Sequence, residues 1–398
     1  MVDRVLIADA LDAESIAELQ SAGIDVAFRP DLTAESLPDA LPGACVLVVR
    51  NTRVTSDAIK AARGLGLIVR AGSGVQNIDV EAASARGVFV SECPGKNAAA
   101  VAELTLGLML AIDRRIPENV NDLRAGRWNR ARYSGALGLK GRVLGLVGFG
   151  AVAREVALRA RAFEMEVRAY ARSLTEQGAK DAEVRRATSL EQLFRDADVV
   201  SLHLPLNHDT RQLVGRRLLG VMKPGAVLIN TAHAELCEPT ALEEAVRAGK
   251  LRLGSDRWAR EPEAGSGELV DALARLEGVY GTHHIGAATR QAEDAIARET
   301  VRIVRHFITA REVLRPVNLL LSPASVGALV VRHLDRVGVL ASVLAELKKA
   351  EVNVETMENV VFAGGEAACA RLRVSSWPGD RLLKELRAIE HVIHVEVI

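Results

Sequence analysis

A glycine-rich turn near residue 148 constrains the fold of this chain more than any other segment. Residues 143–147 form a short apolar run typical of a buried strand, and the run Gly148-Phe-Gly150-Ala-Val-Ala153 follows directly. Apolar residues then recur at helical spacing. Glycine at 148 permits a tight turn, glycine at 150 lets a pyrophosphate approach the backbone, and the small Ala153 lets helix and strand pack closely. The order predicts a dinucleotide site at a helix N-terminus. Its expected contacts are Gly148, Gly150, Ala151 and Val152.

Length and composition exclude several classes of protein. At 398 residues the chain is longer than a single core normally extends, which predicts two or three domains. Lys and Arg together number 51, as do Asp and Glu, so the charge favours neither nucleic acid nor an anionic membrane as a partner. The apolar runs are shorter than a membrane span, and the first ten residues do not resemble a secretory signal. Four cysteines without a C-x-x-C pair predict free thiols in the cytoplasm.

Short apolar strands alternate with helices over most of the chain, which predicts an α/β fold with parallel sheets. The expected strands of a first unit are 5–8, 26–29, 45–49, 67–70 and 88–90, and those of a second are 143–147, 166–170, 198–202, 226–230, 252–255 and 279–281. One long helix is expected from about 98 to 121, and another over 291–308 returns the chain to the first unit. From about residue 325 the order becomes strand, helix, strand, strand, helix, strand. We therefore expect two doubly wound, Rossmann-like domains and a C-terminal ferredoxin-like βαββαβ domain.

Further motifs lie on both sides of the glycine turn. They are Val49-Arg-Asn-Thr-Arg-Val-Thr55, Val69-Arg-Ala-Gly-Ser-Gly-Val-Gln-Asn-Ile-Asp79, His203-Leu-Pro-Leu206, Asp256-Arg-Trp-Ala-Arg-Glu261-Pro and Gly281-Thr-His-His284-Ile-Gly-Ala-Ala-Thr289. Together they resemble the D-2-hydroxyacid dehydrogenase superfamily, most closely its phosphoglycerate dehydrogenase-like members with a C-terminal ACT domain. The resemblance covers nearly the whole chain. It implies a substrate-binding domain over 1–98 with 287–318, a nucleotide-binding domain over 99–286 and an ACT regulatory domain over 325–398.

The implied reaction is hydride transfer between a nicotinamide cofactor and C2 of a D-2-hydroxy acid, a step of serine biosynthesis in the phosphoglycerate-type members. His284 matches the family's catalytic histidine, and Glu261 matches the glutamate that pairs with it. A carboxylate beside an imidazole raises the pKa of the histidine and keeps an acid/base group near neutral pH.

The chain departs from the family at His233. There the family motif Asn-x-Ala-Arg-Gly has an arginine that clamps the substrate carboxylate through two charge-assisted bonds. Histidine offers one donor at a time. Two interpretations stay open: His233 serves a different substrate, or catalysis has weakened and the chain is a nucleotide-binding regulatory protein.

The resemblance also implies further cofactor contacts. These are His203, Pro205, Thr231, Ala232, Asp256 and Gly286. At the end of the second strand, Ala171 and Arg172 occupy the place where NAD-dependent relatives usually carry an acidic residue. Arg172 is able to pair with a 2′-phosphate, and no carboxylate remains in this segment to repel it. The sequence therefore allows NAD or NADP and favours NADP slightly.

Substrate and effector positions complete the expected sites. The substrate contacts implied by the resemblance are Arg50, Arg70, Ser73 and Gly74. The two arginines suit a doubly charged acid, although structural ion pairs explain them equally well. In the C-terminal domain the implied amino-acid effector contacts are His333, Asp335 and Asn353. A domain that only dimerises is the alternative.

Two expectations concern other ligands and partners. The chain is expected to form a homodimer or homotetramer. A metal site built from His233, Cys237, His283 and His284 was considered and is not expected, because metal sites need three or four converging ligands and the family uses none.

Overall fold

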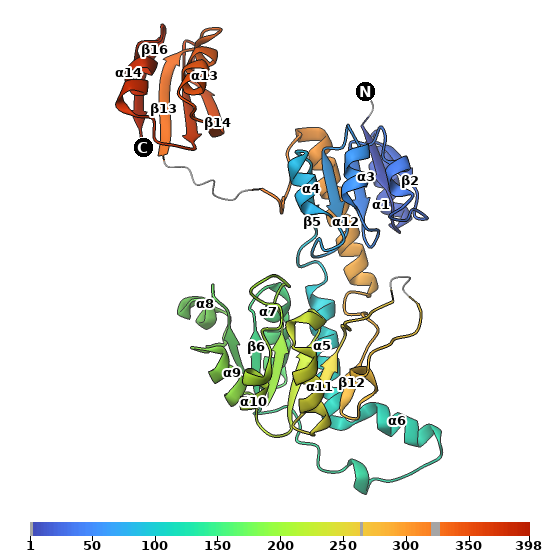
Figure 1. Cartoon of the computed structure of the whole chain (residues 1–398). Coiled ribbons are helices and arrows are strands. Elements are labelled where there is room, and N and C mark those ends of the chain that lie inside the picture. Colours follow the sequence, from blue (N-terminus) through green and yellow to red (C-terminus); the bar gives the residue numbers. More distant parts are fainter. Residues whose placement is uncertain (1–2, 263–265, 320–326) are drawn as a thin grey trace. The chain divides into compact units, whose positions relative to one another are not determined.

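The computed structural model describes residues 3–262, 266–319 and 327–398. The chain divides into two compact units, Met1–Val317 and Asn318–Ile398 (Figure 1). The first unit contains two parallel sheets and the second contains one antiparallel sheet. The predicted fold class is therefore confirmed. The finer boundaries expected within the first unit remain predictions, and residue 325, the expected start of the third domain, lies outside the described residues.

Five parallel strands form the first sheet, in the order β2-β1-β3-β4-β5. The strands are β1 (Arg4–Ile7), β2 (Asp25–Phe28), β3 (Val46–Val49), β4 (Leu67–Arg70) and β5 (Phe89–Glu92). The helices are α1 (Ala13–Ser21), α2 (Leu37–Ala40), α3 (Ser56–Ala61), α4 (Val80–Ala85) and the returning α12 (Arg290–Ala310). Successive strand residues point to opposite faces, so Leu6 and Leu47 pack toward α2 and α3, whereas Val5 and Val46 pack toward α1 and α12.

Seven parallel strands form the second sheet, in the order β12-β11-β10-β9-β6-β7-β8. The strands are β6 (Val143–Val147), β7 (Glu166–Tyr170), β8 (Arg185–Arg186), β9 (Val199–Leu202), β10 (Ala226–Asn230), β11 (Leu251–Ser255) and β12 (Val279–Gly281). The helices are α5 (Ala98–Arg114), α6 (Ile116–Arg124), α7 (Ala151–Ala162), α8 (Glu176–Asp181), α9 (Leu190–Asp196), α10 (Arg216–Val221) and α11 (Pro239–Arg247), with 3-10 turns at η1 (Ala131–Tyr133), η2 (Ala234–Leu236) and η3 (Leu273–Arg275). The strand order reverses between β6 and β9, and ligands of such folds bind at the carboxyl ends of the strands beside that reversal.

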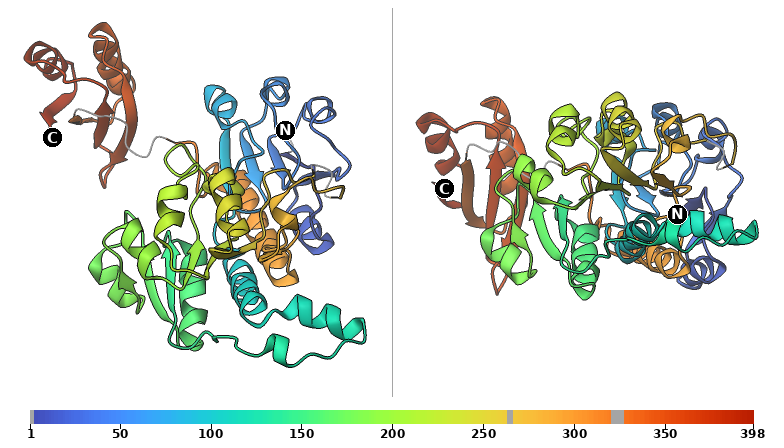
Figure 2. Two further views of the ribbon diagram at one scale, coloured as in Figure 1. Left: turned by 60° about the horizontal axis from the view of Figure 1, so that its bottom comes forward. Right: turned by 90° about the horizontal axis from the view of Figure 1, so that it is seen from below.

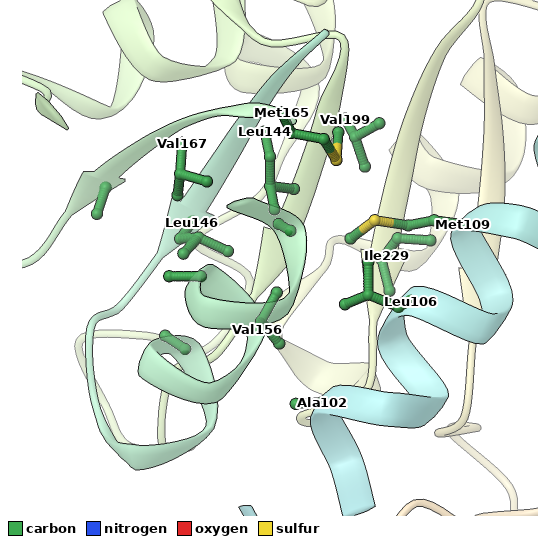
Figure 3. Close-up of a cluster of buried hydrophobic side chains, with 14 of the residues drawn as sticks. Ala102, Leu106, Met109, Leu144, Leu146, Val156, Met165, Val167, Val199 and Ile229 are labelled. Carbon is green, nitrogen blue, oxygen red and sulfur yellow. The ribbon is translucent and has the colours of Figure 1, made fainter. Parts of the chain in front are cut away.

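Buried aliphatic side chains hold α5 and α7 against one face of this sheet (Figure 3). Leu106 and Met109 of α5 approach Ile229 of β10, and Val156 of α7 lies beneath Leu146 of β6. Helices α9, α10 and α11 cover the opposite face. With both faces covered, the strand ends remain as the place for polar groups.

The prediction of a single helix over residues 98–121 is wrong. The chain forms α5 and α6 instead, and Arg115 between them is left-handed with φ 50°. The reason is Pro117, which has no amide to donate to Asp113 and whose ring would clash with the carbonyl of that residue in a continuous helix. Figure 2 shows α6 and the loop after it extending away from the second sheet.

The second unit has the expected order of elements. They are β13 (Gly327–Leu334), α13 (Val339–Lys349), β14 (Val354–Val361), β15 (Ala367–Val374), α14 (Asp380–Arg387) and β16 (Val392–Val397). The antiparallel strand order β14-β15-β13-β16 is that of a ferredoxin-like βαββαβ fold. Leu347 of α13 and Leu386 of α14 pack with Leu372 of β15 in its core. No helix in the described part of the chain is long and apolar enough to span a membrane.

Candidate active site

The glycine turn after β6 leaves the N-terminus of α7 open. Gly148 has φ 88°, and a side chain there would clash with the carbonyl oxygen of His203. Gly150 is the N-cap of α7 and makes no side-chain cap, and a Cβ at this position would meet no atom within 4 Å. Ala153 is fully buried against the sheet. The first-turn amides, including those of Ala151 and Val152, have no acceptor within the helix and suit an anionic phosphate.

The neighbouring strand ends hold other predicted cofactor contacts. Half-buried His203 follows β9, and its Nε2 lies 2.9 Å from Ser201 Oγ. Burial lowers the pKa of His203 to about 3, so its imidazole is neutral at physiological pH. Pro205 is exposed two residues further on.

Arg172 is largely exposed after β7, and its Nη1 lies 3.3 Å from Asp209 Oδ2. Asp209 therefore places a carboxylate beside Arg172, although the segment around Arg172 lacks the acidic residue typical of NAD-dependent relatives. Asp209 comes from the loop after β9, which is remote from Arg172 in sequence, so the local motif gave no sign of it.

A compact turn after β10 presents His233. The side chain of Asn230 donates to the carbonyl of His233 at 2.8 Å and accepts from the amide of Ala232 at 3.1 Å. Thr231 is buried, with its hydroxyl 3.1 Å from that of Thr105 on α5. Burial, together with the positive charge of Arg257, lowers the pKa of His233. His233 is therefore a neutral group held inside the site.

Asp256 fixes the turn that carries His284. Its carboxylate is 1% exposed and accepts from the hydroxyl of Thr282 at 2.6 Å and from the amides of Ile285 and Gly286, both at 2.8 Å. His284 itself is left-handed, with φ 53°. Three bonds to one buried carboxylate hold this backbone in place. Asp256 thus positions the turn, and its expected contact with the cofactor stays a prediction.

His284 and Glu261 form the pair that the sequence predicts. His284 Nδ1 lies 2.7 Å from Glu261 Oε2, and Glu261 Oε1 accepts from the amide of Trp258 at 2.9 Å. The indole of Trp258 donates to the carbonyl of Thr282 at 2.8 Å and so ties the two loops together. Partial burial raises the pKa of Glu261, but the bonds from His284 and Trp258 outweigh that effect and the pKa lies below its usual value. Glu261 is therefore a carboxylate at neutral pH.

Arg257 also reaches this site, and the sequence analysis missed it. Its Nη1 lies 2.5 Å from His284 Nε2, and its Nε lies 3.4 Å from Glu261 Oε1. The signal in the sequence is an arginine directly after Asp256, inside the motif that also contains Glu261.

The loops of the first sheet hold the predicted substrate residues in bonds of their own. Arg70 donates to the carbonyls of Arg50 at 3.1 Å and Ser73 at 2.7 Å, and Arg50 pairs with Glu293 at 3.2 Å. Burial and the neighbouring charge of Arg50 lower the pKa of Arg70.

Gly74, a predicted substrate contact, has its amide bonded within the protein. The amide donates to the side chain of Glu92 at the end of β5. A substrate contact at Gly74 stays a prediction, and the amide would have to exchange this partner to make it.

In the C-terminal unit the three effector positions are not brought together. His333 is 2% exposed, and its ring nitrogens lie 2.7 Å from the carbonyl of Leu334 and 3.3 Å from Asn359 Oδ1. Asp335 and Asn353 are exposed. Asn353 precedes β14 and lies beside the end of β15, which pairs with the start of β13, whereas His333 stands near the other end of β13. A shared effector site for His333 and Asn353 stays a prediction.

Among the described residues there is no group of three or more His, Cys, Asp or Glu side chains suited to a metal ion. Cys237, considered above as a ligand, is buried, and its pKa is raised to about 12 by burial. The four cysteines are all free.

The chain matches known proteins over most of its length. Residues 106–286 match the family described as D-isomer specific 2-hydroxyacid dehydrogenase, NAD binding domain. The chain is 38% identical over 300 residues to a hydroxypyruvate reductase of Thermotoga maritima, covering 75% of this chain and 96% of that protein. A solved glyoxylate reductase from Paecilomyes thermophila is similar with a TM-score of 0.72 at 27% identity, covering 79% of this chain and 98% of that one.

Longer relatives match in part. The chain is 36% identical over 319 residues to a D-3-phosphoglycerate dehydrogenase of Methanocaldococcus jannaschii, covering 79% of this chain and 60% of that protein. A D-3-phosphoglycerate dehydrogenase of Archaeoglobus fulgidus is 34% identical over 292 residues, which cover 73% of this chain and 54% of that protein. The chain therefore spans somewhat more than half the length of these two relatives.

Proposed function

The chain belongs to the family of D-isomer-specific 2-hydroxyacid dehydrogenases, and on that premise we propose that it interconverts a D-2-hydroxy acid and the corresponding 2-keto acid. A bound nicotinamide dinucleotide supplies or accepts the hydride. The observation that carries the proposal is the His284–Glu261 pair at 2.7 Å, which stands at the same sheet edge as the open N-terminus of α7.

His284 is the acid/base group in this proposal. Because Glu261 is a carboxylate, Nδ1 of His284 donates to it, which leaves Nε2 as the atom that exchanges a proton with the substrate oxygen. In the oxidation direction Nε2 takes the hydroxyl proton, and Glu261 stabilises the resulting imidazolium. Asp256 holds the turn that carries His284 in place during both oxidation and reduction.

The choice between NAD(H) and NADP(H) depends on the ion pair between Arg172 and Asp209. We infer that NAD(H) binds with Arg172 left on Asp209, and that NADP(H) binds when Arg172 leaves Asp209 for the 2′-phosphate. The ion pair is exposed to solvent, so exchanging its partner costs little.

We infer that the substrate resembles a phosphorylated or otherwise doubly charged 2-hydroxy acid, as in a phosphoglycerate-type reaction of serine biosynthesis. The support is the pair Arg50 and Arg70 beside the predicted substrate loop. Arg50 has one exposed acidic partner, Glu293, which an anionic substrate group is able to replace.

The test is a panel of keto acids. The protein is assayed with hydroxypyruvate, phosphohydroxypyruvate and glyoxylate, each with NADH and NADPH. We expect reduction of at least one acid, and a kcat about 10²- to 10⁴-fold lower for His284→Ala, the usual contribution of a positioned acid/base group. Nucleotide binding without turnover of any acid would contradict the proposal and favour the regulatory interpretation.

We also propose that the chain forms a homodimer through the arm made by α6 and the loop after it. The arm exposes Leu123 by 58%, Trp128 by 81% and Leu137 by 76% around a hollow of about 910 Å³. Exposed apolar surface of this kind favours association. Ultracentrifugation of the wild type and of Trp128→Asp tests this proposal, and we expect a dimer and a monomer respectively. Binding of an amino-acid effector between paired C-terminal domains would also require such an assembly. It would be detected in the keto-acid assays as inhibition by serine.

A further inference from the structure

Arg257 stands at the reacting edge of the candidate site, although neither the glycine turn nor the acid/base pair requires it. It follows β11 and the buried Asp256, and its side chain is 26% exposed. The guanidinium reaches across to the turn that carries His284, where Nη1 lies 2.5 Å from Nε2. Arg257 therefore contacts the ring atom that the proposed reaction uses.

The chemistry of the two groups fixes the direction of this contact. A guanidinium has donors and no acceptor, and it keeps its charge at any physiological pH. His284 Nε2 must therefore accept the bond, while Nδ1–H donates to Glu261 at 2.7 Å. A substrate oxygen that exchanges a proton with Nε2 has to occupy the place of Nη1. The arginine fork is thus on the substrate side of the imidazole.

An ion pair with Glu261 uses only one nitrogen of the guanidinium. Arg257 Nε is 3.4 Å from Glu261 Oε1, which also accepts from the amide of Trp258 at 2.9 Å. The other oxygen of Glu261 is bonded to His284. Nη1 of Arg257 lies against the histidine, and because a guanidinium carries five N–H donors it is also able to bond an incoming anion.

The surrounding charges favour an anion at this point. His233 lies close enough to Arg257 for the arginine to lower its pKa, in addition to the effect of burial, and it is neutral. Arg70 is also within electrostatic range of Arg257. On the first sheet, the amide of Gly74 is already bonded to Glu92. The chain thus lacks both an arginine at 233 and a free loop amide at 74, and the guanidinium of Arg257 lies within electrostatic range of both His233 and Arg70.

We propose that Arg257 binds the carboxylate of the substrate and takes the place of the arginine that His233 has replaced. On binding, the fork leaves His284 Nε2 and grips the carboxylate, while the substrate's C2 oxygen occupies the freed position. The inference rests on the proposed function and identifies a specificity-determining residue of the same site.

The experiment compares a charged with an uncharged substrate. Glyoxylate and methyl glyoxylate are reduced with NADH by wild type and Arg257→Gln. We expect kcat/KM for the acid to fall about 10- to 100-fold, with the ester changing less than threefold, because only the acid loses charge-assisted bonds. Equal losses on both substrates would mean that Arg257 only supports the pair His284–Glu261, and an unchanged acid would also overturn the proposal. Arg260→Gln, an exposed arginine of the same loop, is the matched control.

A second variant and a binding measurement keep the test independent of folding and turnover. In the double variant Arg257→Gln/His233→Arg, a guanidinium returns to the family position, and we expect at least a tenfold recovery on glyoxylate, by the same charge-assisted bonds. Calorimetry of the NADH-loaded protein should show oxamate binding lost in Arg257→Gln and retained in Arg260→Gln. If the wild type binds NADH but reduces no keto acid, the proposed function fails. If the wild type is active but Arg257→Gln has the same ratio of kcat/KM for glyoxylate to kcat/KM for methyl glyoxylate, only the proposed role of Arg257 is refuted.

Discussion

Replacing Glu261 with glutamine should disable His284, although the two side chains have the same shape. Glu261 Oε2 accepts from His284 Nδ1 at 2.7 Å, and Oε1 accepts from the amide of Trp258 at 2.9 Å. Both oxygens act as acceptors. Glutamine has one oxygen and one NH₂ group, so its NH₂ must face one of two N–H donors.

Either orientation is costly. With the NH₂ group toward His284, the imidazole must place its proton on Nε2, which then points at the guanidinium of Arg257 and leaves no base. With the NH₂ group toward Trp258, two partly buried donors oppose each other at a cost of about 1–3 kcal/mol, which reduces the competent population roughly 5- to 150-fold. The negative charge that stabilises the imidazolium is lost as well. The expected fall in kcat is about 10²- to 10⁴-fold.

The assay measures kcat for the best keto acid of the panel, with NADH affinity measured by fluorescence in parallel. NADH affinity should stay unchanged, because the glycine turn and α7 do not contact Glu261 in any bond described above. Glu277→Gln, the same loss of charge at an exposed position before β12, should stay within twofold of wild type. A Glu261→Gln enzyme within threefold of wild type would refute the tautomer argument.

Four further outcomes are expected. Gly150→Trp should abolish NADH binding in fluorescence titration, because the indole would fill the space in front of α7. Arg172→Ala should raise the Kd of NADPH by a much larger factor than the Kd of NADH. Equal factors for the two cofactors would show that Arg172 does not bind the 2′-phosphate. The nearly buried Glu299 has its pKa lowered chiefly by the hydrogen bond from Arg302, so its contribution is present above the usual carboxyl pKa and lost as pH falls through the lowered value. Glu299→Gln should therefore reduce the free energy of unfolding by about 1–2 kcal/mol at pH 7 and by less in acid, measured by urea unfolding at both pH values. Cys237, with a pKa raised to about 12 by burial, should react with iodoacetamide no faster than the protein unfolds, as followed by mass spectrometry.

The regular elements could be predicted because their causes are local. All strands of the two parallel sheets except β8 were expected to within one or two residues, since a short apolar run bounded by turn residues can pack between two helix layers in few other ways. The helix over 98–121 failed at Pro117, where hydrophobic periodicity was followed past a residue that ends a helix. The two-residue strand β8 was missed because Arg185–Arg186 carries no apolar signal.

The site could be predicted only in part, because its remaining contacts join residues far apart in sequence. His284 and Glu261 come together as expected, through motifs that each carry a recognisable pattern. The partners Asp209 and Glu92 stand 37 and 18 residues from the groups they contact, Asp209 on the loop after β9 and Glu92 at the end of β5. Their effect is set by strand order, which no local spacing reports.

The three consecutive residues after β11 each make contacts in a different part of the site. Asp256 bonds inward to the backbone of the turn that carries His284, Arg257 faces the reacting atoms, and Trp258 joins its own loop to the loop after β12. An exchange at 257 therefore alters which molecules are accepted while the flanking side chains keep the frame intact. Evolution, or a designer, can revise the selectivity of such an enzyme at one codon without first rebuilding the loop.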